Sequence, residues 1–226
     1  MTLPLPLRNR LADLVLDALH DGDARAALAA VAAVCADSHA REGAALPRAF
    51  PTDLFERRDD GWRLRSGHRE HAASFGERAR RAARALATRA LDPPDPPLHV
   101  VLAQAGVLFA AGLYFEVHEV LEPHWIRADG VAREALQGLI QAAVGYQHLA
   151  NGNLAGARAL LHDGAAKLLG RRLEDLDLDP FARGLAAHAR TLAARDLDPG
   201  AVVARFDWSS VPSFPGYVQQ RSQELI

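Results

Sequence analysis

The sequence predicts an all-α protein: a helical bundle around one central apolar helix at 131–150, with a mainly helical N-terminal extension. Apolar residues recur at helical spacing along most of the chain, and segments containing Gly or Pro separate these stretches. The sequence contains neither a Gly-rich phosphate loop nor the alternation of strands and helices that builds a parallel sheet. These observations argue against Rossmann and P-loop chemistry.

Residues 1–91 form the expected N-terminal extension, to which the sequence assigns no role. Leu11, Leu14 and Val15 follow the i, i+3, i+4 spacing of one helix face, and the Asp-Gly-Asp run at 21–23 ends that helix. The Asp-Asp-Gly turn at 59–61 lies between short apolar stretches and predicts a β-hairpin. The expected elements are helices at about 11–19, 24–38 and 68–91, a loop at 39–53 and the hairpin.

Residues 92–97 read Asp-Pro-Pro-Asp-Pro-Pro and cannot continue a helix, because proline lacks the N–H and restricts the residue before it. We therefore expect a stiff linker here, then a helical bundle at 98–210 and a C-terminal tail at 211–226. Gly112 suits the end of one helix, and Asn153 suits the N-cap of another. The expected helices of the bundle are 98–111, 114–127, 131–150, 154–169 and 180–195, with a short one after Pro199.

Composition narrows the class of protein without indicating a reaction. The formal net charge is −2, so the whole molecule has no field that favours nucleic acid or a membrane. Lys167 is the only lysine, and this arginine and alanine bias is typical of a GC-rich genome of bacterial type. Cys35 is the only cysteine, so an intramolecular disulfide cannot form. The N-terminus lacks the order of a signal peptide and no apolar run reaches the ~20 residues of a membrane span, so we expect a cytoplasmic protein.

The densest group of ionisable residues lies at 115–125, where three carboxylates and two imidazoles fall within eleven residues. At about 100° per residue, His118, Glu119 and Glu122 share one arc of the 114–127 helix, with Glu116 about 60° beyond it. Apolar residues occupy the opposite arc. Taken alone, this pattern is also that of an amphipathic helix with a solvated acidic face.

The following helix changes that interpretation, because it is apolar around most of its circumference and is therefore expected to be buried. Gln137, Gln141 and His148 form a polar stripe on it, and buried polar groups need partners. A short loop makes the two helices antiparallel neighbours, so the Glu/His arc can supply those partners. We therefore expect a buried polar cluster between them, with Trp125 in the wall of a pocket and a kink at Pro123.

Three functions remain open for this cluster. The first is a pocket that binds or acts on a small polar molecule, with Glu119 and Glu122 as acid/base groups. The second is a metal-assisted hydrolase with His118, Glu122 and His148 as ligands to a divalent metal; no other cofactor is expected. The third is a polar network that only fixes the helices. The expected catalytic residues are Glu119, Glu122 and His118, and the expected binding residues are Glu116, Gln137, Gln141, His148 and Trp125.

Arginine is concentrated just before the linker. Residues 57–89 contain ten arginines against four acidic residues, whereas 92–135 contain seven acidic residues against two arginines. One interpretation is an interaction module whose helix at 68–91 binds an acidic partner or nucleic acid. The alternative is that this helix docks on the acidic segment of the same chain. Nucleic acid is the less expected partner.

The motifs of the bundle resemble those of a known family. The run from Phe109 to Trp125, the Leu-Gln-Gly-Leu-Ile-Gln-Ala-Ala-Val run at 136–144, His148 and the Gly-Asn-Leu-Ala-Gly-Ala-Arg run at 152–158 are similar to the small all-helical proteins of domain-of-unknown-function family 309. The resemblance extends over about residues 99–206 and implies a compact bundle with one central helix. It implies no activity. The matching positions are Glu116, His118, Glu119, Glu122, Trp125, Gly138, Gln141, His148, Asn153 and Arg158.

Overall fold

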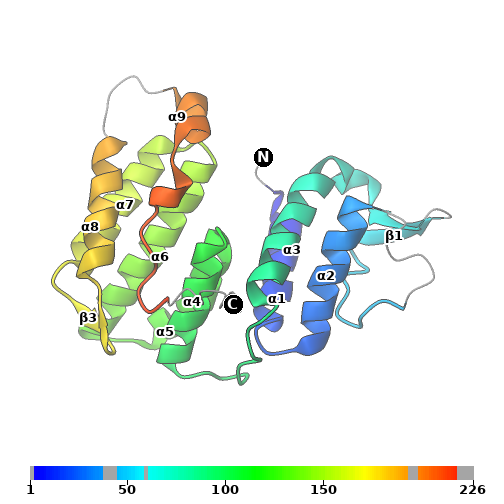
Figure 1. Ribbon diagram of the computed structural model, residues 1–226, viewed down its shortest axis with the longest axis horizontal. Helices are drawn as coiled ribbons and strands as arrows, with labels where there is room; N and C mark the ends of the chain where they lie inside the picture. Colours follow the sequence, from blue (N-terminus) through cyan, green and yellow to red (C-terminus); the bar gives the residue numbers. More distant parts are fainter. Residues whose placement is uncertain (1–2, 38–44, 59–60, 193–197, 218–226) are drawn as a thin grey trace, which may run out of the picture.

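A computed structural model describes residues 3–37, 45–58, 61–192 and 198–217 (Figure 1). The described part is mainly helical, which confirms the all-α prediction. Two groups of helices lie side by side, with the N-terminal group on the right of the figure and the bundle on the left. Within the described residues, no helix is both long enough and apolar enough to cross a membrane.

The N-terminal group consists of three helices and a hairpin. Helices α1 and α2 pack against α3, and the hairpin contacts α2. Asp21 caps α2 by accepting a hydrogen bond from the Asp23 N–H at 2.8 Å. The antiparallel pairing of β1 and β2, with Phe55 opposite Leu64, confirms the expected hairpin, while residues 59–60 of the expected turn lie outside the described residues. The elements are α1 (Leu5–Asp17), α2 (Gly22–Ala36), β1 (Phe55–Arg58), β2 (Gly61–Leu64), a 3₁₀ helix η1 (Ser66–His71) and α3 (Ala72–Leu86).

The bundle follows the order that the sequence predicts, with one small addition. A two-residue β-hairpin occupies part of the charged segment before α8. Gly112 follows α4 with φ +67°, a conformation that glycine adopts without strain. The elements are α4 (Leu98–Ala110), α5 (Tyr114–Arg127), α6 (Gly130–Ala150), α7 (Leu154–Leu168), β3 (Arg172–Leu173), β4 (Leu176–Asp177), α8 (Asp179–Thr191), α9 (Pro199–Arg205) and a 3₁₀ helix η2 (Trp208–Ser210).

Helix α6 packs between α5 and α7, as its central position in the sequence pattern predicts. It approaches α7 closely where Gly138 meets Gly164: a Cβ on Gly164 would lie 3.0 Å from the Gly138 carbonyl oxygen. The burial of α6 differs from the expectation. Gln137, Ile140, Gln141, Val144 and His148 are only half-buried, because α5 and α7 leave one side of α6 partly uncovered.

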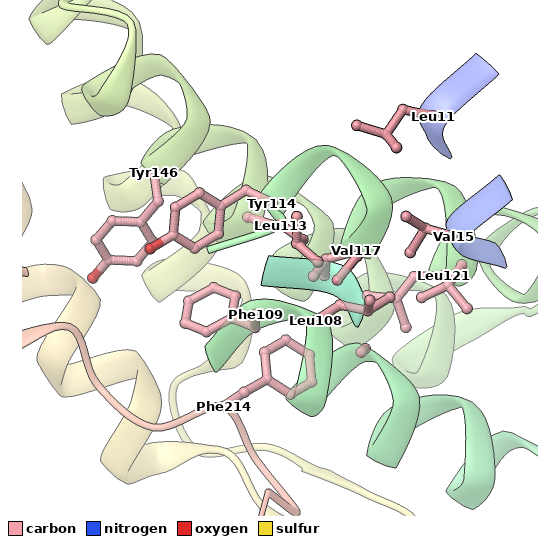
Figure 2. Close-up of a cluster of buried hydrophobic side chains, with 14 of the residues drawn as sticks. Leu11, Val15, Leu108, Phe109, Leu113, Tyr114, Val117, Leu121, Tyr146 and Phe214 are labelled. Atoms are coloured by element: carbon pink, nitrogen blue, oxygen red, sulfur yellow. The ribbon is translucent and has the colours of Figure 1, made fainter. Parts of the chain in front are cut away.

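One continuous hydrophobic core joins the two groups of helices. Leu11 and Val15 of α1 lie near Val117 and Leu121 of α5 (Figure 2). The segment expected to be a linker is also anchored. The Asp92 N–H donates to the Leu19 carbonyl at 3.0 Å, and the Asp92 carboxylate accepts from the buried Gln104 amide at 2.9 Å.

The first residues of the expected C-terminal tail pack on the bundle. Phe214 is buried, and its ring contacts those of Phe109 and Phe181 at 5.3 Å and 5.6 Å between centroids. Phe214 therefore holds the chain that follows η2 against the bundle. Residues 218–226, also assigned to the tail, lie outside the described part of the chain.

Candidate functional site

The structure brings His118, Glu119 and Glu122 together on one side of α5. His118 Nδ1 lies 2.9 Å from a Glu119 oxygen, and His118 Nε2 lies 3.8 Å from a Glu122 oxygen. One potential ligand atom from each residue lies within 4.8 Å of the others, close enough to share a divalent metal. The side chains are 28%, 33% and 41% exposed, so the group is half-exposed and not buried as expected. The reason is its position on α5 opposite the buried Val117, Val120 and Leu121.

The polar stripe of α6 does not join this group through any hydrogen bond in the described parts of the chain. His148 Nδ1 lies 2.7 Å from the Asn153 amide nitrogen, at the point where α6 ends and α7 begins. The metal set predicted from the sequence therefore changes, with Glu119 in the place of His148. Gln141 Oε1 is buried and Gln137 is half-buried. Trp125 is half-buried beneath the Arg133 guanidinium, 4.5 Å from its ring centroid, and Pro123 lies within α5 on its exposed side.

Glu116 faces away from that group and is fully buried. Both of its carboxylate oxygens accept from Arg78 Nη2, at 3.0 Å and 2.8 Å. Arg78 belongs to α3, and its side chain is only 13% exposed. This buried ion pair joins the N-terminal helices to the motif helix. It confirms for Arg78 the interpretation in which the arginine-rich helix docks on the acidic segment of its own chain.

Two clefts lie where α3 faces the bundle. The first, here the arginine cleft, has a volume of about 750 Å³ and is lined by Arg81, Arg84 and Arg89 together with residues of α4. The second, here the tyrosine cleft, has a volume of about 540 Å³. Its walls are α3, the turn after α4, the C-terminal end of α6 and η2, with Glu77, Arg78, Arg81, Tyr114, Gln147, Asn151 and Trp208 among the lining residues. Both volumes are typical of small-molecule sites.

Arg81 lines both clefts and differs from Arg78 and Arg80 of the same helix. Arg78 pairs with Glu116 and Arg80 with Glu77, whereas no carboxylate lies within ion-pair distance of Arg81 among the described residues. Arg81 Nη1 donates to the carbonyls of Ala111 and Gly112 over long distances, 3.3 Å and 3.4 Å, and its Nε is buried. Burial lowers the pKa of Arg81 and the positive charge of Arg78 lowers it further, whereas the carboxylates of Glu77 and Glu116 oppose the shift from beyond ion-pair distance.

Tyr114 lines the tyrosine cleft together with Arg78, Arg81 and Trp208. Burial raises the pKa of Tyr114 to about 12, although the charge of Arg81 opposes the shift. The phenol therefore keeps its proton near neutral pH and can donate a hydrogen bond. Its ring stacks on that of Tyr146 at 5.6 Å and lies 6.5 Å from that of Trp208.

Sequence reasoning did not identify the clefts. The excess of arginine in 57–89 indicated that a cationic helix could dock on the acidic segment. It did not distinguish Arg81, which has no carboxylate partner in the described parts of the chain, from Arg78 and Arg80. No sequence pattern indicated that Trp208 lines the tyrosine cleft, because it reaches the cleft from a 3₁₀ turn almost a hundred residues after Tyr114.

The chain was compared with known proteins. Residues 102–160 match the family model of a domain of unknown function, DUF309. The resemblance inferred from the motifs is thereby confirmed for this segment, which contains α5 and α6 and all ten matching positions. No curated protein and no solved structure matches the chain. The protein is largely helical, and its residues 102–160 match DUF309. This segment supplies two walls of the tyrosine cleft, the turn after α4 and the C-terminal end of α6.

Proposed function

We propose that this protein binds a small anionic molecule where α3 faces the bundle, with Arg81 as the group that holds the anion. The observation that carries the proposal is that Arg81 is largely buried and has no carboxylate partner in the described parts of the chain. A charge removed from water without a counter-ion is destabilising. A bound carboxylate or phosphate would provide that counter-ion.

The other function open to Arg81 is to fasten α3 to the turn after α4 through the two carbonyls. The donor–acceptor distances of 3.3 Å and 3.4 Å are long for hydrogen bonds of a charged donor, which are about 2.7–2.9 Å to a carboxylate. Glu77 and Glu116 act on Arg81 only from beyond ion-pair distance, so no described carboxylate bonds to it directly. Arg78 also lines the tyrosine cleft, but Glu116 already neutralises it, as Arg80 does Glu77, so Arg81 is the cation left without a paired carboxylate among the described lining residues.

The test is isothermal titration calorimetry with inorganic phosphate and with citrate. We expect Arg81→Gln to lose affinity for the anion that binds by tenfold or more, about 1.4 kcal/mol. Arg58→Gln is the control, because Arg58 and its partner Glu56 line neither cleft. Equal affinity in Arg81→Gln and wild type, or no binding of either anion, would contradict the proposal.

A second candidate function is favoured by the geometry of His118, Glu119 and Glu122. We propose that this group binds a divalent metal, because the three residues offer one nitrogen and two carboxylate oxygens within 4.8 Å of one another. Three protein ligands leave coordination positions for water, which is the arrangement of hydrolytic metal sites. Without a metal, the same glutamates and histidine are the acid/base groups for a small polar molecule.

The metal proposal is tested by titration of Zn²⁺ and Mn²⁺ into the metal-free protein. We expect one ion to bind per chain and His118→Ala to weaken its binding at least tenfold. His124→Ala is the control, since His124 lies on the same helix outside the group. Metal binding that is unchanged in His118→Ala would eliminate this site.

A further inference from the structure

Three kinds of side chain line the tyrosine cleft: charged, aromatic and amide. Arg81 supplies positive charge from α3, beside the ion-paired Arg78 and Glu77, and Trp208 supplies a large ring from η2. The amides of Gln147 and Asn151 reach the same cleft from the end of α6. A cleft that served a bare inorganic anion would need only the first of these three parts.

Trp208 is held in place although it is 38% exposed. Its indole meets the ring of Phe206 edge-on, with centroids 4.9 Å apart and an interplanar angle of 70°. Tyr114 lies nearly parallel to it, with centroids 6.5 Å apart and an angle of 28°, close to the upper limit for ring contact. The indole is therefore fixed in orientation while much of its surface remains available to a planar ring.

The segment that carries Trp208 is anchored to α8. His188 Nε2 lies 3.2 Å from the Ser210 hydroxyl oxygen, and the His188 ring meets that of Phe206 at 5.2 Å. His188 Nδ1 in turn lies 2.7 Å from the Tyr146 hydroxyl oxygen of α6. These contacts position η2 over the end of the bundle, so that the place of Trp208 in the cleft is set by three elements.

The two amides add hydrogen-bonding groups of both kinds. Gln147 Nε2 donates to Asn151 Oδ1 at 3.3 Å, a long contact that uses one donor and one acceptor of the pair. Each side chain keeps further donor and acceptor capacity. Planar amides of this kind pair with the donor and acceptor edges of heterocyclic bases, and aromatic side chains stack on their faces.

We infer that the ligand of the tyrosine cleft is a mononucleotide. Its phosphate binds Arg81, its base stacks on Trp208, and the edge of the base reaches Gln147 and Asn151. Tyr114, which keeps its proton near neutral pH, donates to the phosphate or the sugar. This inference rests on the proposed anion site and adds the recognition of a planar base to it.

Adenosine 5′-monophosphate and ribose 5-phosphate distinguish recognition of the base from binding of the phosphate. Both contain the phosphate and the sugar, but only the nucleotide has a base. We expect calorimetry to show that wild type binds the nucleotide at least tenfold more tightly than the sugar phosphate. Trp208→Leu should abolish most of this preference and leave the affinity for ribose 5-phosphate within about twofold. Retained affinity for ribose 5-phosphate also shows that this variant is folded.

The intrinsic fluorescence of wild type gives a second readout of base stacking, which can be measured without a comparison of affinities. The chain has three tryptophans, and only Trp208 lines the cleft. Stacking of a base should quench the fluorescence of wild type, and Trp208→Phe should lose this quenching. Phenylalanine keeps a ring in the cleft, so its affinity for the nucleotide should fall less than that of Trp208→Leu.

Two results would overturn the inference and leave the anion site standing. In one, the nucleotide and ribose 5-phosphate bind equally and both depend on Arg81. In the other, the nucleotide binds more tightly but Trp208→Leu keeps the preference, which would seat the base elsewhere. If neither compound binds wild type, or if binding is unchanged in Arg81→Gln, the anion site itself is wrong and this inference fails with it.

Discussion

At the scale of single residues, the buried ion pair of Glu116 and Arg78 is the strongest electrostatic feature of the fold. Removing one partner leaves an uncompensated buried charge, which typically costs about 3–5 kcal/mol. We therefore predict that Glu116→Gln lowers the free energy of unfolding by this amount. Arg78→Met combined with Glu116→Leu should be less harmful than Glu116→Gln alone, because it removes both charges. Urea denaturation followed by circular dichroism measures the three proteins.

Glu77→Gln is the control for this prediction. Glu77 also pairs with an arginine of α3, but its side chain is 50% exposed, and exposed pairs contribute about 1 kcal/mol or less. A loss of stability in Glu116→Gln no greater than that in Glu77→Gln would contradict the role given to the buried pair. A double variant less stable than Glu116→Gln would contradict the charge argument.

The ionisable residues of α5 show what the sequence can predict at this scale. His118, Glu119 and Glu122 are neighbours at i+1, i+3 and i+4, so helical geometry alone brings them together. The partner of Glu116 is 38 positions away in the chain. Helical spacing cannot identify such a partner. It placed Glu116 only about 60° beyond the arc of His118, Glu119 and Glu122. The burial of Glu116 becomes intelligible once α3 lies against α5.

At the scale of elements, helix periodicity predicts the helices of the bundle well, because each reflects local spacing of apolar residues. It predicts their exposed faces less well. Helix α6 has Ile140 and Val144 on the same side as Gln137 and Gln141, so its sequence is apolar nearly all round. Which side is left partly uncovered depends on where α5 and α7 pack. The arrangement of neighbours is a tertiary property that one helix does not encode.

His188 connects three elements, α8, α6 and the segment of η2, and this makes the connection sensitive to pH. Burial lowers the pKa of His188 below its usual value of 6.5, an effect that Asp207 opposes. The folded state therefore favours the neutral ring, whereas the unfolded chain takes up a proton once the pH falls to about 6.5. Stability should be fully present above this pH and should decline as the pH falls further.

The measurement compares the free energy of unfolding at about pH 7.5 and about pH 5.5 in wild type and His188→Gln. We expect the acid-induced loss to be smaller in the variant, even though the variant is less stable at the higher pH because its contact with Tyr146 is altered. His99→Gln is the control, since His99 is exposed at the start of α4. An acid-induced loss in His188→Gln as large as that in wild type would refute the prediction.

At the scale of the whole molecule, the clefts exist only because two groups of helices meet. The DUF309 match ends at residue 160 and begins after α3, so Arg78, Arg81 and Trp208 all lie outside it. Tyr114, Gln147 and Asn151 lie inside it. The matched segment therefore contributes a hydrogen-bonding wall, and the rest of the chain contributes the charge and the indole. A reading confined to the family motif could find His118, Glu119 and Glu122 but not the clefts.

The continuous core predicts that the two groups of helices unfold together. The sequence suggested separate units at 1–91 and 98–210, divided by a stiff linker, yet the buried residues form one cluster from Leu3 to Phe214. Trp62 reports on the N-terminal group and Trp125 on the bundle. Two double variants isolate these signals: Trp125→Phe with Trp208→Phe, and Trp62→Phe with Trp208→Phe. Because unfolding of either group would expose the shared core, we expect the same urea midpoint from fluorescence and from circular dichroism within each variant. A fluorescence midpoint that departs from the circular dichroism midpoint in either variant would show two separately unfolding units, and the clefts would then lie at a joint between independent domains.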